Sequence, residues 1–130
     1  TLNPSIEGGA YVTVADYAKL LVMHLRGGTC GDTRVLSAEA TARMQKDRLA
    51  EYGGTTGNPS SPGYGLGFWV NAANQVVTDP GAYGSFPLLD QKRRYGVFIA
   101  IELTSAVGVQ LGAAVKPALD AIFDEAMIAE

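Results

Sequence analysis

The chain has 130 residues, a formal net charge of −3 and 47% hydrophobic residues, which predicts a packed soluble domain or part of one. The mild acidity argues against nucleic acid as a partner, because domains that bind nucleic acid carry a basic face. One cysteine, Cys30, excludes an internal disulfide and a cysteine-based zinc site, and no apolar run reaches the roughly 18 residues of a membrane span.

The chain begins with Thr1 rather than Met, so we expect it to be processed, truncated or cut from something longer. After an irregular entry segment, Thr1–Tyr11, a helix is predicted from Thr13 to about Arg26. Thr13 and Asp16 resemble a capping box, and apolar residues then recur at helical spacing. Two glycines, Gly27-Gly28, end this helix because glycine readily adopts the left-handed conformation of a helix cap.

The only histidine, His24, falls near the C-terminal end of this helix. A cation there interacts favourably with the helix dipole, so a structural role is expected. One histidine without a second ligand at suitable spacing is not a metal site, and we expect no metal and no cofactor.

Ser37 is the predicted N-cap of a second, shorter helix that ends between Gln45 and Arg48. The following stretch, Glu51–Gly63, is rich in Gly, Pro, Ser and Thr and predicts a long loop. It is either a simple linker or the rim of a site, because loops of this length inside compact domains are often functional.

The stretch from Gly63 to Glu102 organises the sequence. Three apolar runs, Tyr64–Val70, Gln75–Leu89 and Tyr95–Leu103, are rich in residues that favour strands. Short turns between them, Asn71–Asn74 and Asp90–Arg94, predict a three-stranded antiparallel meander. The triplet Asp79-Pro80-Gly81 interrupts the middle strand and suggests an edge whose backbone groups face something other than a neighbouring strand.

A final helix is predicted after Thr104 or Ser105, kinked at Pro117 and packed on one face of the sheet. The element order lacks alternating strand and helix units, so the fold class is α+β with an antiparallel sheet and flanking helices. We treat residues 1–130 as one portion of a domain. Residues 1–62 form a helical subregion with a loop, and residues 63–130 form the strands and the C-terminal helix.

No complete catalytic set can be assembled from these residues. Each of the six serines lacks a lysine three positions later, so the Ser-x-x-Lys pair of an acylated serine and its base is absent. Gly63, Gly65 and Gly67 superficially suggest a phosphate loop, but their alternate spacing is better explained by close approach of another element. Of the scattered carboxylates, Asp79 alone lies within an apolar run, where it either stabilises a turn or belongs to a site.

Three stretches, in the same order along the chain, resemble the C-terminal part of the serine beta-lactamase-like family. This group holds class C beta-lactamases, D-alanyl-D-alanine carboxypeptidases and related esterases. The first stretch, Glu7–Leu21, resembles the family's Gly-Gly entry, capped turn and following helix. The second, Val35–Glu39 with Met44, resembles its Leu-Leu-Ser-x-Glu helix. The third is Gly63–Phe68 followed by Asp79–Ser85 and Asp90, and it resembles the family's Gly-Tyr-Gly-Leu-Gly-Phe strand and third active-site motif.

The resemblance implies a partial beta-lactamase or transpeptidase-like fold and a division of labour. In the family, Ser-x-x-Lys and a tyrosine motif precede the region seen here, and the third motif, Lys-Thr-Gly or His-x-Gly, edges the cleft. Carried over, Asp79-Pro80-Gly81 occupies the third motif, and the Ala82 N–H is the oxyanion donor. Tyr83 adjoins this substrate-binding triplet and imitates the tyrosine motif, although coincidence explains that match better.

Asp79 departs from the family's Lys or His, because an anion replaces a cation that would hold a substrate carboxylate. That disfavours beta-lactams and peptidoglycan stems and favours neutral or cationic esters or amides. The resemblance implies an inactive C-terminal fragment of a serine hydrolase, with an extracytoplasmic location. Its partner is the missing N-terminal half of the domain, or another copy that pairs through an exposed sheet edge. The alternatives are a non-catalytic binding module with the same fold, and an enzyme that uses Asp79 with Tyr83.

Overall fold

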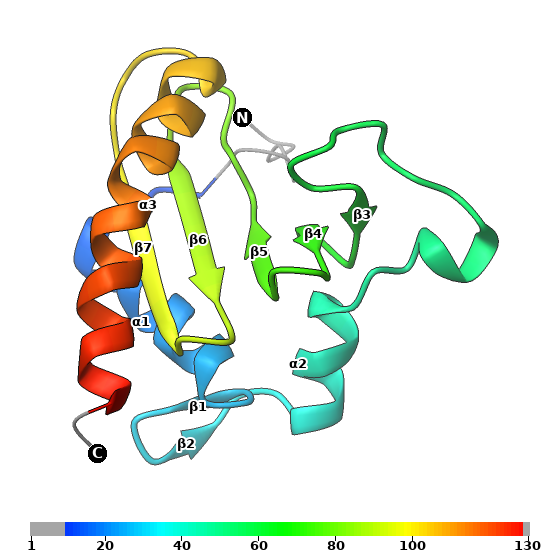
Figure 1. The fold of residues 1–130 in the computed structure, drawn as a ribbon. Helices are drawn as coiled ribbons and strands as arrows, with labels where there is room; N and C mark the ends of the chain where they lie inside the picture. Colours follow the sequence, from blue (N-terminus) through cyan, green and yellow to red (C-terminus); the bar gives the residue numbers. More distant parts are fainter. Residues whose placement is uncertain (1–9, 129–130) are drawn as a thin grey trace, which may run out of the picture.

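The computed structural model describes residues 10–128 and contains three α-helices and one five-stranded antiparallel sheet (Figure 1). The sheet order is β3-β4-β5-β6-β7, so consecutive strands are always neighbours. The elements in chain order are α1 Val14–Leu25, β1 Thr29–Cys30, β2 Thr33–Arg34, α2 Ala38–Gln45, a 3₁₀ turn Ala50–Tyr52, β3 Gly63–Tyr64, β4 Trp69–Asn71, β5 Val76–Thr78, β6 Phe86–Asp90, β7 Tyr95–Ile99 and α3 Ser105–Ile128. The predicted α+β class and antiparallel sheet are confirmed.

The prediction of three strands is wrong, because two of the three apolar runs contain two strands each. A turn around Gly67, whose φ is +82°, separates β3 from β4. Residues 79–85 form a loop between β5 and β6, which pair with each other through Val77 and Leu89. The triplet Asp79-Pro80-Gly81 is therefore a connection between two neighbouring strands and not a break within one.

The helix boundaries follow the predicted caps. Thr13 Oγ1 accepts a hydrogen bond from Asp16 N at 3.1 Å, and Ser37 Oγ accepts one from Ala40 N at 3.1 Å. These side chains satisfy N–H groups that have no partner within the helix. The final helix begins at Ser105 and continues through Pro117, which is exposed. The short β1–β2 hairpin was not predicted.

The two long helices cover opposite faces of the sheet, with α1 behind it and α3 in front in Figure 1. On the α1 face, Leu21 packs with Val77 and Leu89. On the α3 face, Leu88 and Tyr95 pack with Phe123. Leu88 and Leu89 belong to different clusters because successive side chains of a strand point to opposite faces.

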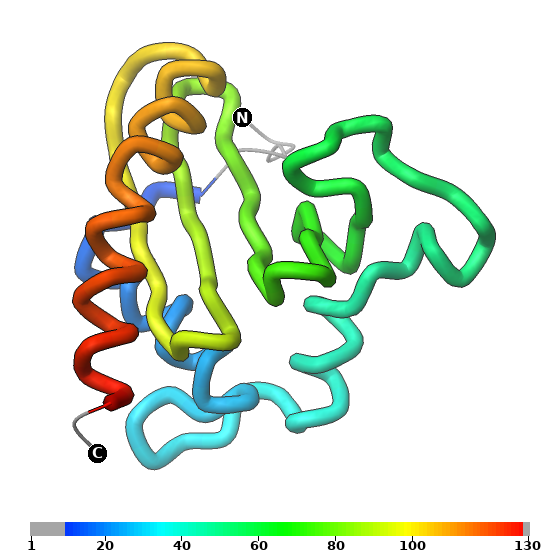
Figure 2. The backbone as a smooth tube through the Cα atoms, in the orientation of Figure 1, coloured from blue at the N-terminus to red at the C-terminus, as the bar shows by residue number. Residues whose placement is uncertain are grey.

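Two of the three glycines at alternate positions, Gly63 and Gly65, mark close contacts as predicted, whereas a Cβ on Gly67 would meet nothing within 4 Å. A Cβ on Gly63 would meet the Asp47 carboxylate, and one on Gly65 would meet the carbonyl oxygen of Met44. The chain from α2 to β3 is the wide loop in Figure 2, beside the β3–β4 end of the sheet, whereas α3 lies over β6 and β7. The predicted long loop lies here.

By length and composition alone, α3 could cross a membrane. The sequence did not predict a possible membrane span here, because polar residues divide α3 into shorter apolar runs. Core helices of soluble proteins pass the same test, and one side of α3 packs on β6 and β7 through Leu119 and Phe123.

α3 packs closely on the loop before β6 at Gly108, where an added Cβ would meet the backbone carbonyl of Gly84. We predict that Gly108→Ala lowers the free energy of unfolding by about 1–3 kcal/mol, because the clash with backbone outweighs the gain of about 1 kcal/mol in helix propensity. Urea denaturation would measure this. The matched control is Gln110→Ala on an exposed position of the same helix, and equal or greater stability of Gly108→Ala would contradict the prediction.

Candidate functional site

The five residues predicted to form a site, Asp79 to Tyr83, are consecutive in the loop between β5 and β6. This loop lies beyond Thr78, the last residue of β5, which pairs with Trp69 of β4. Neither neighbouring strand pairs with the loop, so its backbone groups are available for other partners, as the sequence suggested.

Backbone hydrogen bonds tie the loop to the start of α3. The Gly81 N–H donates to Ser85 O at 2.8 Å, and the Ser105 N–H donates to Ala82 O at 3.2 Å. The Leu103 N–H donates to Tyr83 O at 3.0 Å. Ala82 is exposed, and within residues 10–128 its own N–H has no acceptor. The Ala82 N–H is therefore an unused donor of this loop, as is the N–H of the neighbouring Tyr83 within the described residues.

Asp79 and Pro80 lie on different faces of the sheet. Partial burial raises the pKa of Asp79. Burial, and to a lesser extent the charge of Asp79, raises the pKa of Tyr17, which stacks on Phe98 at 4.1 Å between ring centroids. Tyr17 belongs to α1, so Asp79 lies on the α1 side of the sheet, whereas Pro80 lines a cavity on the α3 side.

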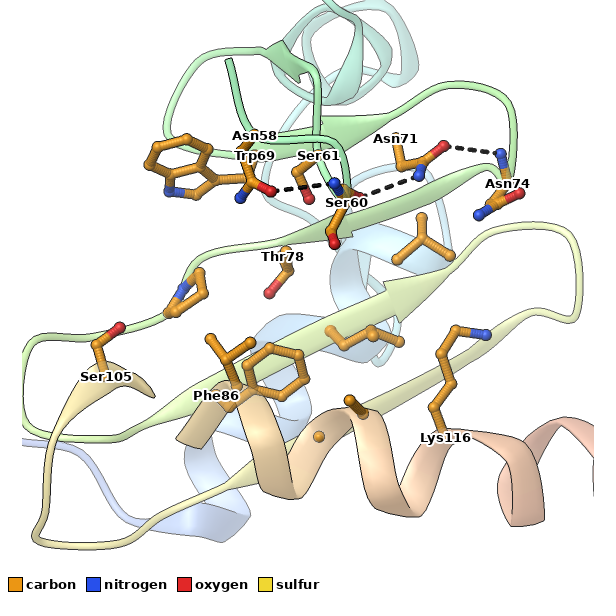
Figure 3. Close-up of a pocket in the computed structure, with 16 residues that line it drawn as sticks. Asn58, Ser60, Ser61, Trp69, Asn71, Asn74, Thr78, Phe86, Ser105 and Lys116 are labelled. Atoms are coloured by element: carbon orange, nitrogen blue, oxygen red, sulfur yellow. Dashed lines mark hydrogen bonds between the residues drawn. The ribbon is translucent and has the colours of Figure 1, made fainter. Parts of the chain in front are cut away.

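This α3 cavity has a volume of about 390 Å³ and lies between the sheet and the N-terminal half of α3 (Figure 3). Sequence reasoning did not find it, because its walls come from segments far apart in the chain. Its lining comprises Asn58, Ser60, Ser61, Trp69, Asn71, Asn74, Val76, Thr78, Pro80, Phe86, Leu88, Ser105, Val109, Gly112, Ala113 and Lys116.

A buried charge cluster lies at one end of this cavity. Asp90, the last residue of β6, is fully buried. Its Oδ2 accepts hydrogen bonds from Lys116 Nζ at 3.1 Å and from Arg93 Nη1 at 3.2 Å, and its Oδ1 accepts one from the Arg93 N–H at 2.8 Å. The sequence showed Asp90 and Arg93 in a turn, but Lys116 is 26 residues away, so the pairing was not visible.

The cluster continues along α3. Burial by itself would raise the pKa of Asp120, but hydrogen bonds from Lys116 and Tyr95 outweigh it, and the pKa is lowered. Burial and the Asp120 carboxylate together raise the pKa of Tyr95. Arg93 also binds Asp124 through Nε at 2.8 Å and Nη2 at 2.9 Å. These ion pairs fasten α3 to the β6–β7 hairpin, a structural role.

His24 is buried, with 6% of its surface exposed. Gln91 Nε2 donates to Gln45 Oε1 at 2.7 Å, so the Gln45 amide nitrogen faces His24 Nδ1 at 3.2 Å and donates to it. Phe68 packs edge-on against the imidazole, and burial lowers the pKa of His24. This buried position agrees with the predicted structural role of His24. The prediction of a positively charged imidazole is wrong at neutral pH, because burial and the hydrogen bond from Gln45 both favour the neutral ring. Residues 10–128 contain no group of three His, Cys, Asp or Glu side chains that could hold a metal ion.

No protein-family model matches the chain, and no curated protein matches it significantly. Among solved structures, it is similar to a protein described as a "putative beta-lactamase" from Bacteroides dorei DSM 17855. The match has a TM-score of 0.66 and 25% sequence identity, and it covers 94% of this chain but 43% of the other.

The chain thus has part of the fold of the beta-lactamase family, as the resemblance of its motifs implied. It spans less than half the length of the protein that it matches.

His24 predicts a pH dependence of stability. Because the pKa of His24 is lowered in the folded state, the unfolded chain binds a proton more readily, and stability should fall as the pH drops below about 6.5 toward the lowered pKa. Urea denaturation at pH 7.5 and pH 5.5 should show this loss for the natural chain, and His24→Gln, which cannot titrate, should lack that component. Since His24 is the only histidine, its Cε1–H proton signal reports the pKa directly, and a pKa above 6.5 would contradict the prediction.

Proposed function

We propose that the chain is the C-terminal portion of a beta-lactamase-related serine hydrolase that cleaves an ester, amide or beta-lactam through an acyl-enzyme. The observation that carries this proposal is the similarity over 94% of the chain to less than half of a putative beta-lactamase. Because these 130 residues contain no Ser-x-x-Lys pair, the nucleophile is supplied from outside them, and the chain alone is inactive.

In this proposal the Ala82 N–H is one donor of the oxyanion hole. When a serine attacks the substrate carbonyl, negative charge develops on the carbonyl oxygen, and a fixed donor aimed at that oxygen stabilises the transition state. Ala82 suits this role because it is exposed, its N–H has no acceptor within residues 10–128, and its carbonyl is held by Ser105. Because these hydrogen bonds hold the loop, the Ala82 N–H needs no reorganisation at the moment of reaction.

Asp79 bears on the substrate class. A carboxyl group at this position cannot hold a substrate carboxylate as a lysine or histidine cation would. We therefore propose a neutral or cationic ester or amide, with Pro80, Gly81 and Tyr83 beside the bound molecule. The same side chain favours the alternative function, a binding module that has kept the fold without the chemistry.

Intact-mass measurement tests the proposal. The purified chain should gain no mass after incubation with a fluorophosphonate or, separately, with a penicillin, because it holds no activated serine. The same chain extended by its natural upstream sequence should gain one fluorophosphonate adduct. An adduct on the 130 residues alone would overturn the missing nucleophile, and no adduct on the extended chain would favour the binding module.

We also propose a partner for the open edge of the sheet. Within residues 10–128, β7 is an edge strand that pairs only with β6, and unpaired backbone groups of an edge strand are a template for another strand. The partner is the missing N-terminal half of the domain, or a second copy when that half is absent.

Light scattering after size-exclusion chromatography tests the edge pairing. The molar mass of the isolated chain should rise above 13.6 kDa as its concentration is raised, because association is second order in chain. Adding the upstream segment as a separate polypeptide should convert these oligomers into a one-to-one complex. A clean monomer at high concentration would argue against edge pairing.

A further inference from the structure

The α3 cavity has the size and lining of a small-molecule site. Its volume of about 390 Å³ falls within the range of roughly 300–1,000 Å³ that is usual for ligand pockets. Phe86 and Leu88 from the sheet, with Val109 and Ala113 from α3, form apolar walls. Trp69 lines the cavity from the side of β4 (Figure 3).

Polar groups lie at the rim, and several of them are already paired with one another. Asn71 Nδ2 donates to Ser60 O at 3.0 Å, and Asn71 Oδ1 accepts from the Asn74 N–H at 3.1 Å. Within the part of the chain that the structure describes, the hydroxyls of Ser60 and Ser105 make no hydrogen bond to protein. The rim can therefore offer a few hydrogen bonds to a ligand.

The charge at the cavity is compensated. Among the described residues, Lys116 is the one charged residue that lines it, and the ammonium group already contacts Asp90 at 3.1 Å and Asp120 at 2.7 Å. An anionic ligand would have to compete with two carboxylates for this lysine. A cationic ligand would meet the Lys116 ammonium group, because Asp90 and Asp120, which already accept hydrogen bonds from Lys116, Arg93 and Tyr95, do not line the cavity. Either charge would lose hydration without a free partner.

We propose that the α3 cavity binds a small neutral molecule with an apolar body and one or two hydrogen-bonding groups, of the size of a medium-chain alcohol or ester. The apolar body lies between Phe86, Leu88 and Val109, and the polar group reaches Ser60 or Ser105. One end of the cavity, at Pro80 and Ser105, adjoins the loop that carries Ala82. Binding here needs no nucleophile, so this proposal goes beyond the proposed function and does not depend on it.

The chain offers a direct reporter for this site, because Trp69 is the only tryptophan and lines the cavity. Its indole N–H resonance would be followed while the chain is titrated with 1-octanol, octanoate and octylammonium at pH 7. These probes share one apolar chain and differ in charge. We expect a saturable shift with 1-octanol, and affinities at least about tenfold weaker for both ions.

Two variants test the location. Ala113 lines the cavity and Ala114 does not, although both are exposed residues of α3. Ala113→Phe fills the cavity and should weaken 1-octanol binding at least about tenfold, whereas Ala114→Phe should change it less than about twofold. Circular dichroism would check that both variants fold, and the charge series on the natural chain remains decisive if one does not.

The proposal is overturned if 1-octanol produces no saturable shift of Trp69, or if the two ions bind as well as the alcohol. It is also overturned if the two variants behave alike. A shift of Trp69 that appears on raising the chain concentration without any probe, together with a doubled molar mass, would show that a second copy fills the cavity instead. The adduct test described above can fail without affecting any of these results.

Discussion

The arrangement of this chain depends on β6, which lies between β5 and β7 and in which all five residues from Phe86 to Asp90 are buried. Leu89 faces α1, and Leu88 faces α3, so this one strand supplies both hydrophobic clusters. Its last residue, Asp90, brings a carboxylate into the interior. A buried charge is costly unless it is paired and hydrogen-bonded, and here Arg93 and Lys116 provide the partners. Apolar contacts hold α3 against the sheet, and the ion pairs join it to the β6–β7 hairpin.

The position of α3 in turn sets both candidate sites. Its first residue, Ser105, holds the Ala82 carbonyl, and its Gly108 lies directly against Gly84. The loop between β5 and β6 is therefore braced by the helix rather than by neighbouring strands. The next turns of the same helix form one wall of the α3 cavity and end at Lys116. A shift of α3 along the sheet would move the Ala82 loop, the cavity and the charge cluster together.

A partial fold does not by itself establish an activity, because function depends on particular side chains in a site and not on the scaffold. Here the scaffold is that of a beta-lactamase over less than half of such a protein. The residues that depart from the family pattern are then the informative ones. In the proposed function Asp79 takes the place of a cation of the family, and its charge contributes to the raised pKa of Tyr17 on α1. The α3 cavity, on the opposite face, is closed at one end by a lysine that is already neutralised. Both features underlie our proposals that anionic small molecules are disfavoured.

The sequence by itself determined the helices, their caps, the two tight turns and the family resemblance. These depend on local patterns, such as Thr13 and Ser37 before apolar residues at helical spacing. It did not determine the number of strands, because the breaks at Gly67 and at residues 79–85 are recognised only from which strands pair. It placed Asp79 to Tyr83 in one segment, but it did not show that Asp79 and Pro80 lie on opposite faces of the sheet. It also missed the neutral state of His24, the pairing of Asp90 with Lys116 and the α3 cavity. Only the tertiary structure decided these, because burial and contacts between residues far apart in the chain arise only when α1 and α3 pack on the sheet.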